Sequence, residues 1–179
     1  KPCIYLSVHM VMRLLRMIAQ CIAIVPHARL HMRPLQKCLA TQWSEAEGQF
    51  ENLVLIKAST HRSPQWWSNK KLLAGSPFHT PILQVPISTD ASLDGWGAYL
   101  GKRVMQGLWT PLQKTYHLNY LELIAIQLAF QLALKAFLTI VYSCVVRIRT
   151  DNMTAMYYIQ KQGGTHSLPL SLQDQAIWL

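Results

Sequence analysis

Residues 85–109 read VPISTDASLDGWGAYLGKRVMQGLW, three short runs rich in β-forming and aromatic residues with turn signals between them. Branched and aromatic side chains favour strands, and short runs bounded by glycine are typical of antiparallel hairpins. We therefore expect strands over 85–89, 96–100 and 104–109. The turns or bulges between them are expected at Gly95, Gly101, Lys102 and Gly107.

Helical periodicity follows these strands. Apolar residues recur at three- and four-residue steps from 119 to 137, which predicts a long helix, and the β-branched run 145–150 predicts a fourth strand. Helical spacing returns over 151–160 and stops at Gly163-Gly164, and a further element begins near residue 168. The order β-β-β-α-β-α predicts an α/β domain with a mixed sheet flanked by helices.

The residues before this domain have a helical texture. Their apolar periodicity predicts helices over 6–24, 28–43 (with a break or a fresh start at Pro34) and 44–58. Gly75, Pro77, Pro81 and Pro86 follow at close intervals, which indicates a domain boundary. The sequence therefore predicts a helical segment over 1–80 and an α/β domain over 81–179.

Composition restricts the class of partner. The 179 residues carry 17 lysines and arginines against 8 aspartates and glutamates, a formal charge of +9, which favours a polyanion such as nucleic acid. The apolar run 136–146 is far shorter than the roughly 20 residues of a spanning helix, so no membrane is expected. The four cysteines show neither zinc spacing nor a disulfide framework, which predicts an intracellular protein, in the cytoplasm or nucleus, that is not secreted.

Three acidic residues stand at positions where they could converge. Asp90 closes the predicted strand 85–89, Asp151 closes the strand 145–150, and Glu122 lies in the first turns of the long helix. If the two strands are neighbours, their carboxylates meet, and the repulsion between them requires divalent cations. Two magnesium ions about 4 Å apart could activate a water and stabilise the leaving oxygen of a phosphodiester.

Each of these acids also has an ordinary structural explanation. Asp90 would be a turn residue, Glu122 would compensate the helix dipole, and Asp151 would cap the helix that follows. Spacing alone leaves both interpretations open.

The same residues belong to three ordered motifs: Thr89-Asp90-Ala91-Ser92 with Gly95-Trp96-Gly97-Ala98, then His117-Leu118-Asn119-Tyr120-Leu121-Glu122-Leu123, then Thr150-Asp151-Asn152-Met153-Thr154-Ala155. They resemble the first three motifs of a type 1 ribonuclease H domain. Together with residues 159–165 they resemble, more narrowly, the ribonuclease H region of reverse transcriptases from DIRS-type retrotransposons. Residues 1–80 are similar to the thumb-to-connection segment that precedes the nuclease in those polyproteins, through residues 26–29, 33–36 and 66–67.

This resemblance implies a ribonuclease H-like fold and metal-dependent hydrolysis of the RNA strand of RNA–DNA hybrids. Asp90, Glu122 and Asp151 would be the catalytic carboxylates and would hold two Mg²⁺ or Mn²⁺ ions. Asn119 and Ser92 match positions that approach the substrate, where the 2′-hydroxyl would distinguish RNA. For Asn119, capping of the long helix is an equal alternative. The partners implied are the hybrid and the remainder of a reverse transcriptase polyprotein.

One departure from the family pattern leaves a second function open. The family has a fourth carboxylate after a fifth strand, which this sequence lacks, so the domain is expected to be C-terminally truncated. Asp174 lies too close to Asp151 to take that role and is expected at the surface or as a cap. The alternative is therefore a non-catalytic nucleic-acid-binding remnant of a reverse transcriptase, inactive through truncation.

Basic residues of the first 80 positions offer a surface for either function. Arg29, Arg33 and Lys37 recur at four-residue steps, which predicts three cations on one helix face. Further cations that could track a phosphate backbone are Arg13, Arg16, Arg62, Lys70 and Lys71. An ordinary solvated face explains the same pattern, and Trp66-Trp67 could serve either base stacking or packing.

Overall fold

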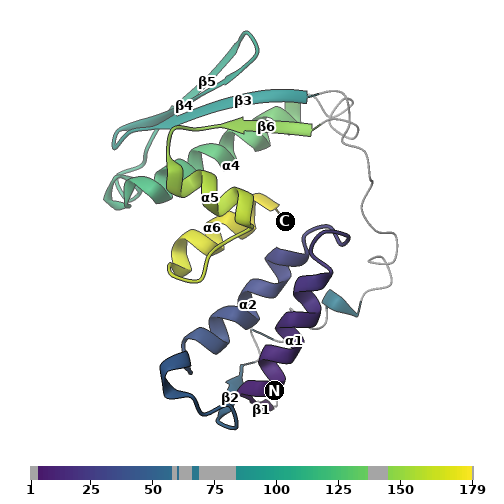
Figure 1. Ribbon diagram of the computed structural model, residues 1–179. Helices are drawn as coiled ribbons and strands as arrows, with labels where there is room; N and C mark the ends of the chain where they lie inside the picture. The colour runs from purple at the N-terminus through teal and green to yellow at the C-terminus, as the bar shows by residue number, and fades with distance from the viewer. Residues whose placement is uncertain (1–3, 58–59, 61–65, 69–83, 137–144, 179) are drawn as a thin grey trace. The chain divides into compact units, whose positions relative to one another are not determined.

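The computed structural model describes residues 4–57, 60, 66–68, 84–136 and 145–178. The chain divides into two compact units, Lys1–Ser76 and Pro77–Leu179 (Figure 1). Each unit has hydrophobic core residues of its own.

The first unit combines two helices with a two-stranded sheet. Strand β1 (Ile4–Ser7) leads directly into helix α1 (Val8–Gln20), helix α2 (Ala28–Ala40) follows, and strand β2 (Leu53–Ile56) returns to pair antiparallel with β1. Apolar side chains of α1, α2 and β2 form the buried core, which consists of Val8, Val11, Ile18, Met32, Leu35, Val54 and Ile56. The segment is therefore mainly helical, but the small sheet was not predicted.

The predicted helix over 44–58 is wrong. Over the described residues 44–57 the helical structure is limited to the 3-10 turn η1 (Glu45–Glu47), and Ser44 makes no side-chain capping bond to it. Gly48 follows with a φ of 65°, a left-handed conformation that ends the helical path. Leu53–Ile56 then pair with β1, because a tertiary partner supplies hydrogen bonds that local periodicity cannot reveal.

The two long helices differ from prediction in smaller ways. Helix α1 begins at Val8 because the Ser7 side chain accepts a hydrogen bond from the Met10 backbone N–H at 3.3 Å. Helix α2 continues through Pro34 without the predicted break. Leu30, Met32 and Leu35, on both sides of the proline, are buried, and this packing holds the helix together where one backbone hydrogen bond is missing.

Several side chains singled out in the sequence have ordinary packing roles in this unit. Trp67 packs against the core, and Trp66 stacks on the ring of His31 with 3.8 Å between centroids. Cys21 and Cys38 are free thiols, whereas Cys3 and Cys144 lie outside the described residues. Arg62, Lys70 and Lys71, which could track a phosphate backbone or belong to a solvated face, also lie outside them.

The second unit is built on a four-stranded mixed sheet in the order β5-β4-β3-β6. Strands β3 (Gln84–Ala91), β4 (Gly95–Leu100) and β5 (Arg103–Leu108) form an antiparallel meander. Strand β6 (Val145–Arg149) lies parallel to β3 on its other side. All four strands were predicted.

Gly101 has the role expected of it in this sheet, whereas Gly95 and Gly107 are strand residues. Gly101, with a φ of 61°, does form the turn between β4 and β5 with Lys102. Gly95 is the first residue of β4 and Gly107 the second-last residue of β5, and neither position has room for a Cβ unless its neighbours shift. A Cβ on Gly95 would come within 2.5 Å of the Gly107 carbonyl oxygen, and one on Gly107 would come within 2.6 Å of the Trp96 indole nitrogen.

Among its described residues this unit has three helices: α4 (Leu118–Ala136), α5 (Met153–Lys161) and α6 (Leu168–Trp178). The short 3-10 turn η3 (Gln113–Thr115) precedes α4. Figure 1 shows the three helices on one side of the sheet. Helix α4 lies in the middle, because small residues on one side, Ala129 and Ala133, pack on the strands, and Leu123 and Ile126 on the other side pack on α5 and α6.

The predicted fold class is confirmed. The second unit is a mixed α/β sheet flanked by helices, an arrangement consistent with a ribonuclease H-like fold. In the part of the chain that the structure describes, no helix combines the length and the apolar character needed to cross a membrane. Most of the apolar run 136–146 lies outside the described residues.

Candidate metal centre and active site

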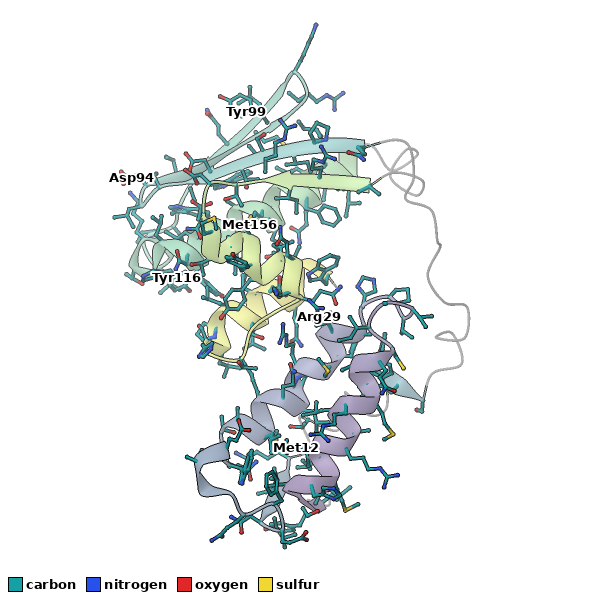
Figure 2. The ribbon with its side chains drawn as sticks, in the orientation of Figure 1. Met12, Arg29, Asp94, Tyr99, Tyr116 and Met156 are labelled. Carbon is teal, nitrogen blue, oxygen red and sulfur yellow. The ribbon has the colours of Figure 1, made fainter. Side chains whose placement is uncertain are left out.

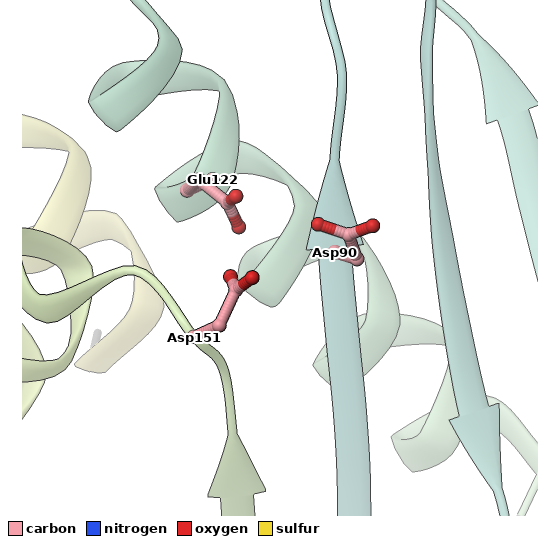
Figure 3. Close-up of side chains that lie close together, drawn as sticks. All are labelled: Asp90, Glu122 and Asp151. Carbon is pink, nitrogen blue, oxygen red and sulfur yellow. The ribbon is translucent and has the colours of Figure 1, made fainter.

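The three acidic residues singled out in the sequence come together at one place (Figure 3). Each of Asp90, Glu122 and Asp151 offers a carboxylate oxygen, and these oxygens all lie within 4.8 Å of one another. Asp90 and Asp151 are exposed, whereas Glu122 is buried with 2% of its surface accessible. The cluster therefore has two accessible ligands and one buried ligand.

The parallel pairing of two strands brings the aspartates together. Strands β3 and β6 run side by side in register, with Ser88 opposite Arg149. Asp90, the second-last residue of β3, lies two residues after Ser88. Asp151, just after β6, lies two residues after Arg149. Because the carboxyl ends of parallel strands meet at the same edge of the sheet, the two side chains are neighbours although they are 61 residues apart in the sequence.

Helix α4 supplies the third carboxylate. Its first turns pack on the end of β3, where Leu121 and Ala125 belong to the same buried cluster as Ala91. This contact brings Glu122 to the strand end, and the Ala91 backbone N–H donates a hydrogen bond to its carboxylate. The other carboxylate oxygen, Oε2, is buried and has no hydrogen-bond partner among the described residues.

The environment of Glu122 disfavours its charged form. Burial raises the pKa of this carboxyl from 4.5 to about 7, repulsion from Asp90 and Asp151 adds to the rise, and the hydrogen bond from Ala91 partly opposes it. A cation at the cluster would reverse the balance, since it would neutralise the repulsion and give the unpartnered oxygen a ligand role. The residues therefore fit a divalent cation that prefers oxygen ligands.

The ordinary explanations for the three acids do not hold. Asp90 lies within β3 and pairs with Gly97, so it is not a turn residue. Glu122 is past the first turn of α4, which contains no acidic residue. The cap of α5 is Asn152, not Asp151. None of the three acids has the turn, dipole or capping role, and what they share is their place in the cluster.

Asn119 is also near the cluster, and the proposed capping role is wrong. It lies inside α4, three residues before Glu122, and its Oδ1 accepts a hydrogen bond from the Asn152 side-chain amide at 3.0 Å. The helix is capped by His117 instead, whose Nδ1 accepts from the Asn119 backbone N–H at 3.2 Å. The side chain of Asn119 therefore hydrogen-bonds to a residue outside its own helix.

Ser92 shapes the turn that follows Asp90. Its hydroxyl donates to the Gly95 carbonyl oxygen and accepts from the backbone N–H groups of Asp94 and Gly95, each at 3.2 Å. Its own carbonyl accepts from the Trp109 indole N–H at 2.8 Å. The one hydroxyl proton of Ser92 is therefore used within the turn, and contact of this residue with substrate stays a prediction.

Asp94 and Asp174 do not belong to the cluster. Asp94, labelled in Figure 2, is exposed and forms an ion pair with Lys114 at 2.8 Å, which lowers the pKa of its carboxyl. Asp174 lies within α6 and is fully buried, so the expectation of a surface or capping position was wrong. The reason is that α6 packs along α4 and turns this side of the helix inward.

One residue of the site was missed from the sequence. Asn152 both caps α5 and holds Asn119, and the only signal for it was an Asn at the start of the predicted helix 151–160. That signal predicts the cap but not the second contact, because the second partner comes from α4.

Comparison with known proteins gives distant structural similarity only. No family model and no curated protein matches the chain. A structure of the foamy viral protease-reverse transcriptase dRH in complex with double-stranded DNA is similar over 96% of this chain and 30% of that one, with a TM-score of 0.40 and 13% identity. The native protease-reverse transcriptase of prototype foamy virus is similar over 96% of this chain and 23% of that one, with a TM-score of 0.37 and 11% identity. The chain thus spans less than a third of the length of either.

Proposed function

We propose that this chain is the ribonuclease H region of a reverse transcriptase, of the DIRS retrotransposon type, and hydrolyses the RNA strand of RNA–DNA hybrids with two Mg²⁺ or Mn²⁺ ions. The observation that supports the proposal most is the convergence of Asp90, Glu122 and Asp151 within 4.8 Å on the ends of β3 and β6 and the start of α4. Three ordered motifs that resemble this family carry the same three acids.

The arrangement suits hydrolysis of a phosphodiester. Bound cations would activate a water and stabilise the charge on the leaving oxygen. The two exposed aspartates offer oxygens where a nucleic-acid strand can reach them, and the buried glutamate holds the inner side of the same site. Glu122 would give up its proton to solvent when a cation binds, so that all three carboxylates could act as ligands.

The polymer that would bind is a polyanion, which agrees with the formal charge of +9. In this proposal the first unit corresponds to the thumb-to-connection segment and the second to the nuclease. The protein would act inside the cell, as one part of a longer polyprotein. Free thiols at Cys21 and Cys38 are compatible with a reducing compartment.

The first test is cleavage of a labelled RNA–DNA hybrid in Mg²⁺ or Mn²⁺ by this chain and by its Asp90→Asn variant. We expect cleavage by the parent chain and a loss of at least about 100-fold in the variant, because one metal ligand is removed. The matched control is Asp94→Asn, which removes an equal charge four residues away. Asp94 is exposed and outside the cluster, so this variant should cleave at nearly the parent rate.

Two results would count against the nuclease. If Asp94→Asn and Asp90→Asn lose the same activity, the effect is one of charge and not of the cluster. If the parent chain binds the hybrid with steep salt dependence but cleaves nothing in either metal, the non-catalytic binding remnant is the better description.

A further inference from the structure

We propose that Asn152 is a positioning residue that sets the direction of the Asn119 side-chain amide, so that Asn119 presents a hydrogen-bond donor to the bound nucleic acid. The inference rests on the proposed function, because it concerns the substrate of the same site. It adds a residue that contacts neither the metal nor the strand and acts only through Asn119.

The direction of an asparagine amide must be set by its partners. The oxygen and the NH₂ group have nearly the same size, so an isolated side chain can turn either one toward a ligand. A backbone N–H, by contrast, can only donate. Any chain of hydrogen bonds that begins at a backbone N–H therefore has one direction throughout.

Such a chain runs from α5 to α4. The backbone N–H of Ala155 donates to Oδ1 of Asn152 at 2.9 Å, which makes the oxygen of Asn152 the acceptor of the helix cap. The remaining group, Nδ2, then donates to Oδ1 of Asn119 at 3.0 Å. The Asn119 oxygen is occupied in turn, which leaves its Nδ2 as the group that can meet a ligand.

Asn152 is held on its main chain as well. Its backbone N–H donates to the Thr150 hydroxyl at 3.1 Å, and its carbonyl accepts from the Met156 backbone N–H at 3.0 Å. Both its main chain and its side chain are therefore fixed, and the half-buried position limits competition from water. A residue fixed in this way can impose its direction on a neighbour that is fixed at one end only.

The hydrogen bond between Asn152 and Asn119 lies beside the three acids, where the substrate would bind. Asn119 stands one helical turn before Glu122, and Asn152 follows Asp151 directly, so the link joins the two segments that carry two of the three acids. A donor at Asn119 suits acceptors on a nucleic-acid strand, such as sugar oxygens and the acceptor edges of bases. We therefore expect the substrate to be a nucleic-acid strand that presents a hydrogen-bond acceptor to Asn119 beside the cluster.

The test is a double-mutant cycle between the two asparagines. Asn152→Ser keeps an oxygen that can cap α5 but is too short to reach Asn119, and Asn119→Ala removes the donor itself. Affinity for the hybrid is measured in Ca²⁺, together with kcat/KM in Mg²⁺. We expect each single variant to weaken hybrid binding by about fivefold to tenfold, the effect of one neutral hydrogen bond, and the double variant to be no weaker than Asn119→Ala.

A third variant checks the direction of the amide. Asn152→Asp retains the capping oxygen but has no donor, so Asn119 would turn its NH₂ group toward the new carboxylate and present its oxygen to the strand. We expect it to bind the hybrid at least as weakly as Asn152→Ser. Binding of Mn²⁺ to the protein alone and the melting temperature should stay near the parent values in Asn152→Ser, because the cap and the three acids are retained.

The outcomes separate this inference from the proposed function. Additive losses in the double variant, or full affinity in Asn152→Ser, would overturn the positioning role while the nuclease stands. A parent chain that binds no hybrid at all would overturn the proposed function, and the positioning role with it.

Discussion

At Glu122, burial and the repulsion of two neighbouring acids act in the same direction. The side chain is 2% exposed, one of its oxygens has no partner among the described residues, and its pKa is raised to about 7. A carboxyl of this kind is costly to keep charged and is stabilised by a proton or a cation. If the cluster binds a metal ion as proposed, Glu122 links that binding to pH, and this dependence can be measured without any substrate.

The metal-free protein should lose stability as the pH rises from about 4.5 to about 7. In this window the native Glu122 keeps its proton while the unfolded one releases it, so the native state binds more protons and the free energy of unfolding falls. The loss from this group is at most about 3 kcal/mol, from the size of the pKa shift. It is measured by urea unfolding in EDTA across the window.

Glu122→Gln is the control for this pH dependence. The amide resembles the protonated carboxyl and does not titrate, so the variant should show a flatter profile over the same pH range. Saturating Mg²⁺ should flatten the profile of the parent chain as well, because bound metal stabilises the charged form. An equally steep fall in Glu122→Gln would show that other groups cause it.

At the scale of elements, α4 determines where the third acid lies. The helix is apolar on nearly all sides because it packs between the sheet and the pair α5 and α6. Alanines on the side facing β3 and β4 allow a close approach, and this approach carries Glu122 to the end of β3. The distance between α4 and the sheet therefore helps to set the geometry of the cluster of three acids.

A larger side chain at Ala129 should disturb this packing. Ala129 is fully buried against Ile87, Ala98 and Leu100, so Ala129→Leu would overfill the space and lower the free energy of unfolding by about 1–3 kcal/mol. We expect weaker Mn²⁺ binding as well, because the helix must shift from the sheet. Urea unfolding and Mn²⁺ titration measure the two effects.

The matched control for Ala129 lies on the same helix. Leu132 is 39% exposed, so Leu132→Gln should change stability by no more than about 0.5 kcal/mol and leave Mn²⁺ binding intact. If Ala129→Leu unfolds more easily but binds Mn²⁺ as well as the parent, the distance between α4 and the sheet does not control the metal centre.

At the scale of the whole molecule, the chain consists of two units with separate cores. The three acids of the candidate metal centre all belong to Pro77–Leu179, and so does the hydrogen bond between Asn119 and Asn152. The assignment of the first unit as a thumb-to-connection segment and of the second as the nuclease stays a prediction. It can be tested by separating them.

Residues 77–179 expressed alone should fold and bind Mn²⁺ with an affinity within about threefold of that of the full chain, because every ligand and its supporting contacts are local to this unit. Hybrid binding should weaken more than metal binding, since the basic residues of the first unit are removed. Circular dichroism, Mn²⁺ titration and hybrid binding check these points. Loss of Mn²⁺ binding in a folded second unit would contradict the expectation.

Local pattern was enough to predict much of the second unit. The strands of the 85–109 region, the long helix that carries Glu122 and the β-branched strand before Asp151 each satisfy their own periodicity, so their residues favour one structure before any tertiary contact forms. The resemblance to ribonuclease H motifs rests on these same short segments. Three candidate ligands could therefore be named from sequence.

The predictions that were wrong or incomplete concern residues whose contact partners lie far away in the sequence. Leu53–Ile56 became a strand because β1 pairs with it, and Asp174 became buried because α6 packs on α4. The second contact of Asn152 required α4 as well. In each case the residue had an acceptable local alternative, and a contact between separate elements selected the other one.

The amino-acid sequence alone determined which residues could bind metal, because strand ends and helix starts are local properties. Only the tertiary structure decided that their oxygens lie within 4.8 Å of one another, that Glu122 is buried and that Asn119 is held by Asn152. The physical reason is that these facts depend on the parallel register of β3 with β6 and on the packing of α4 against the sheet. Both are set by the sum of contacts between elements, and no single segment contains them.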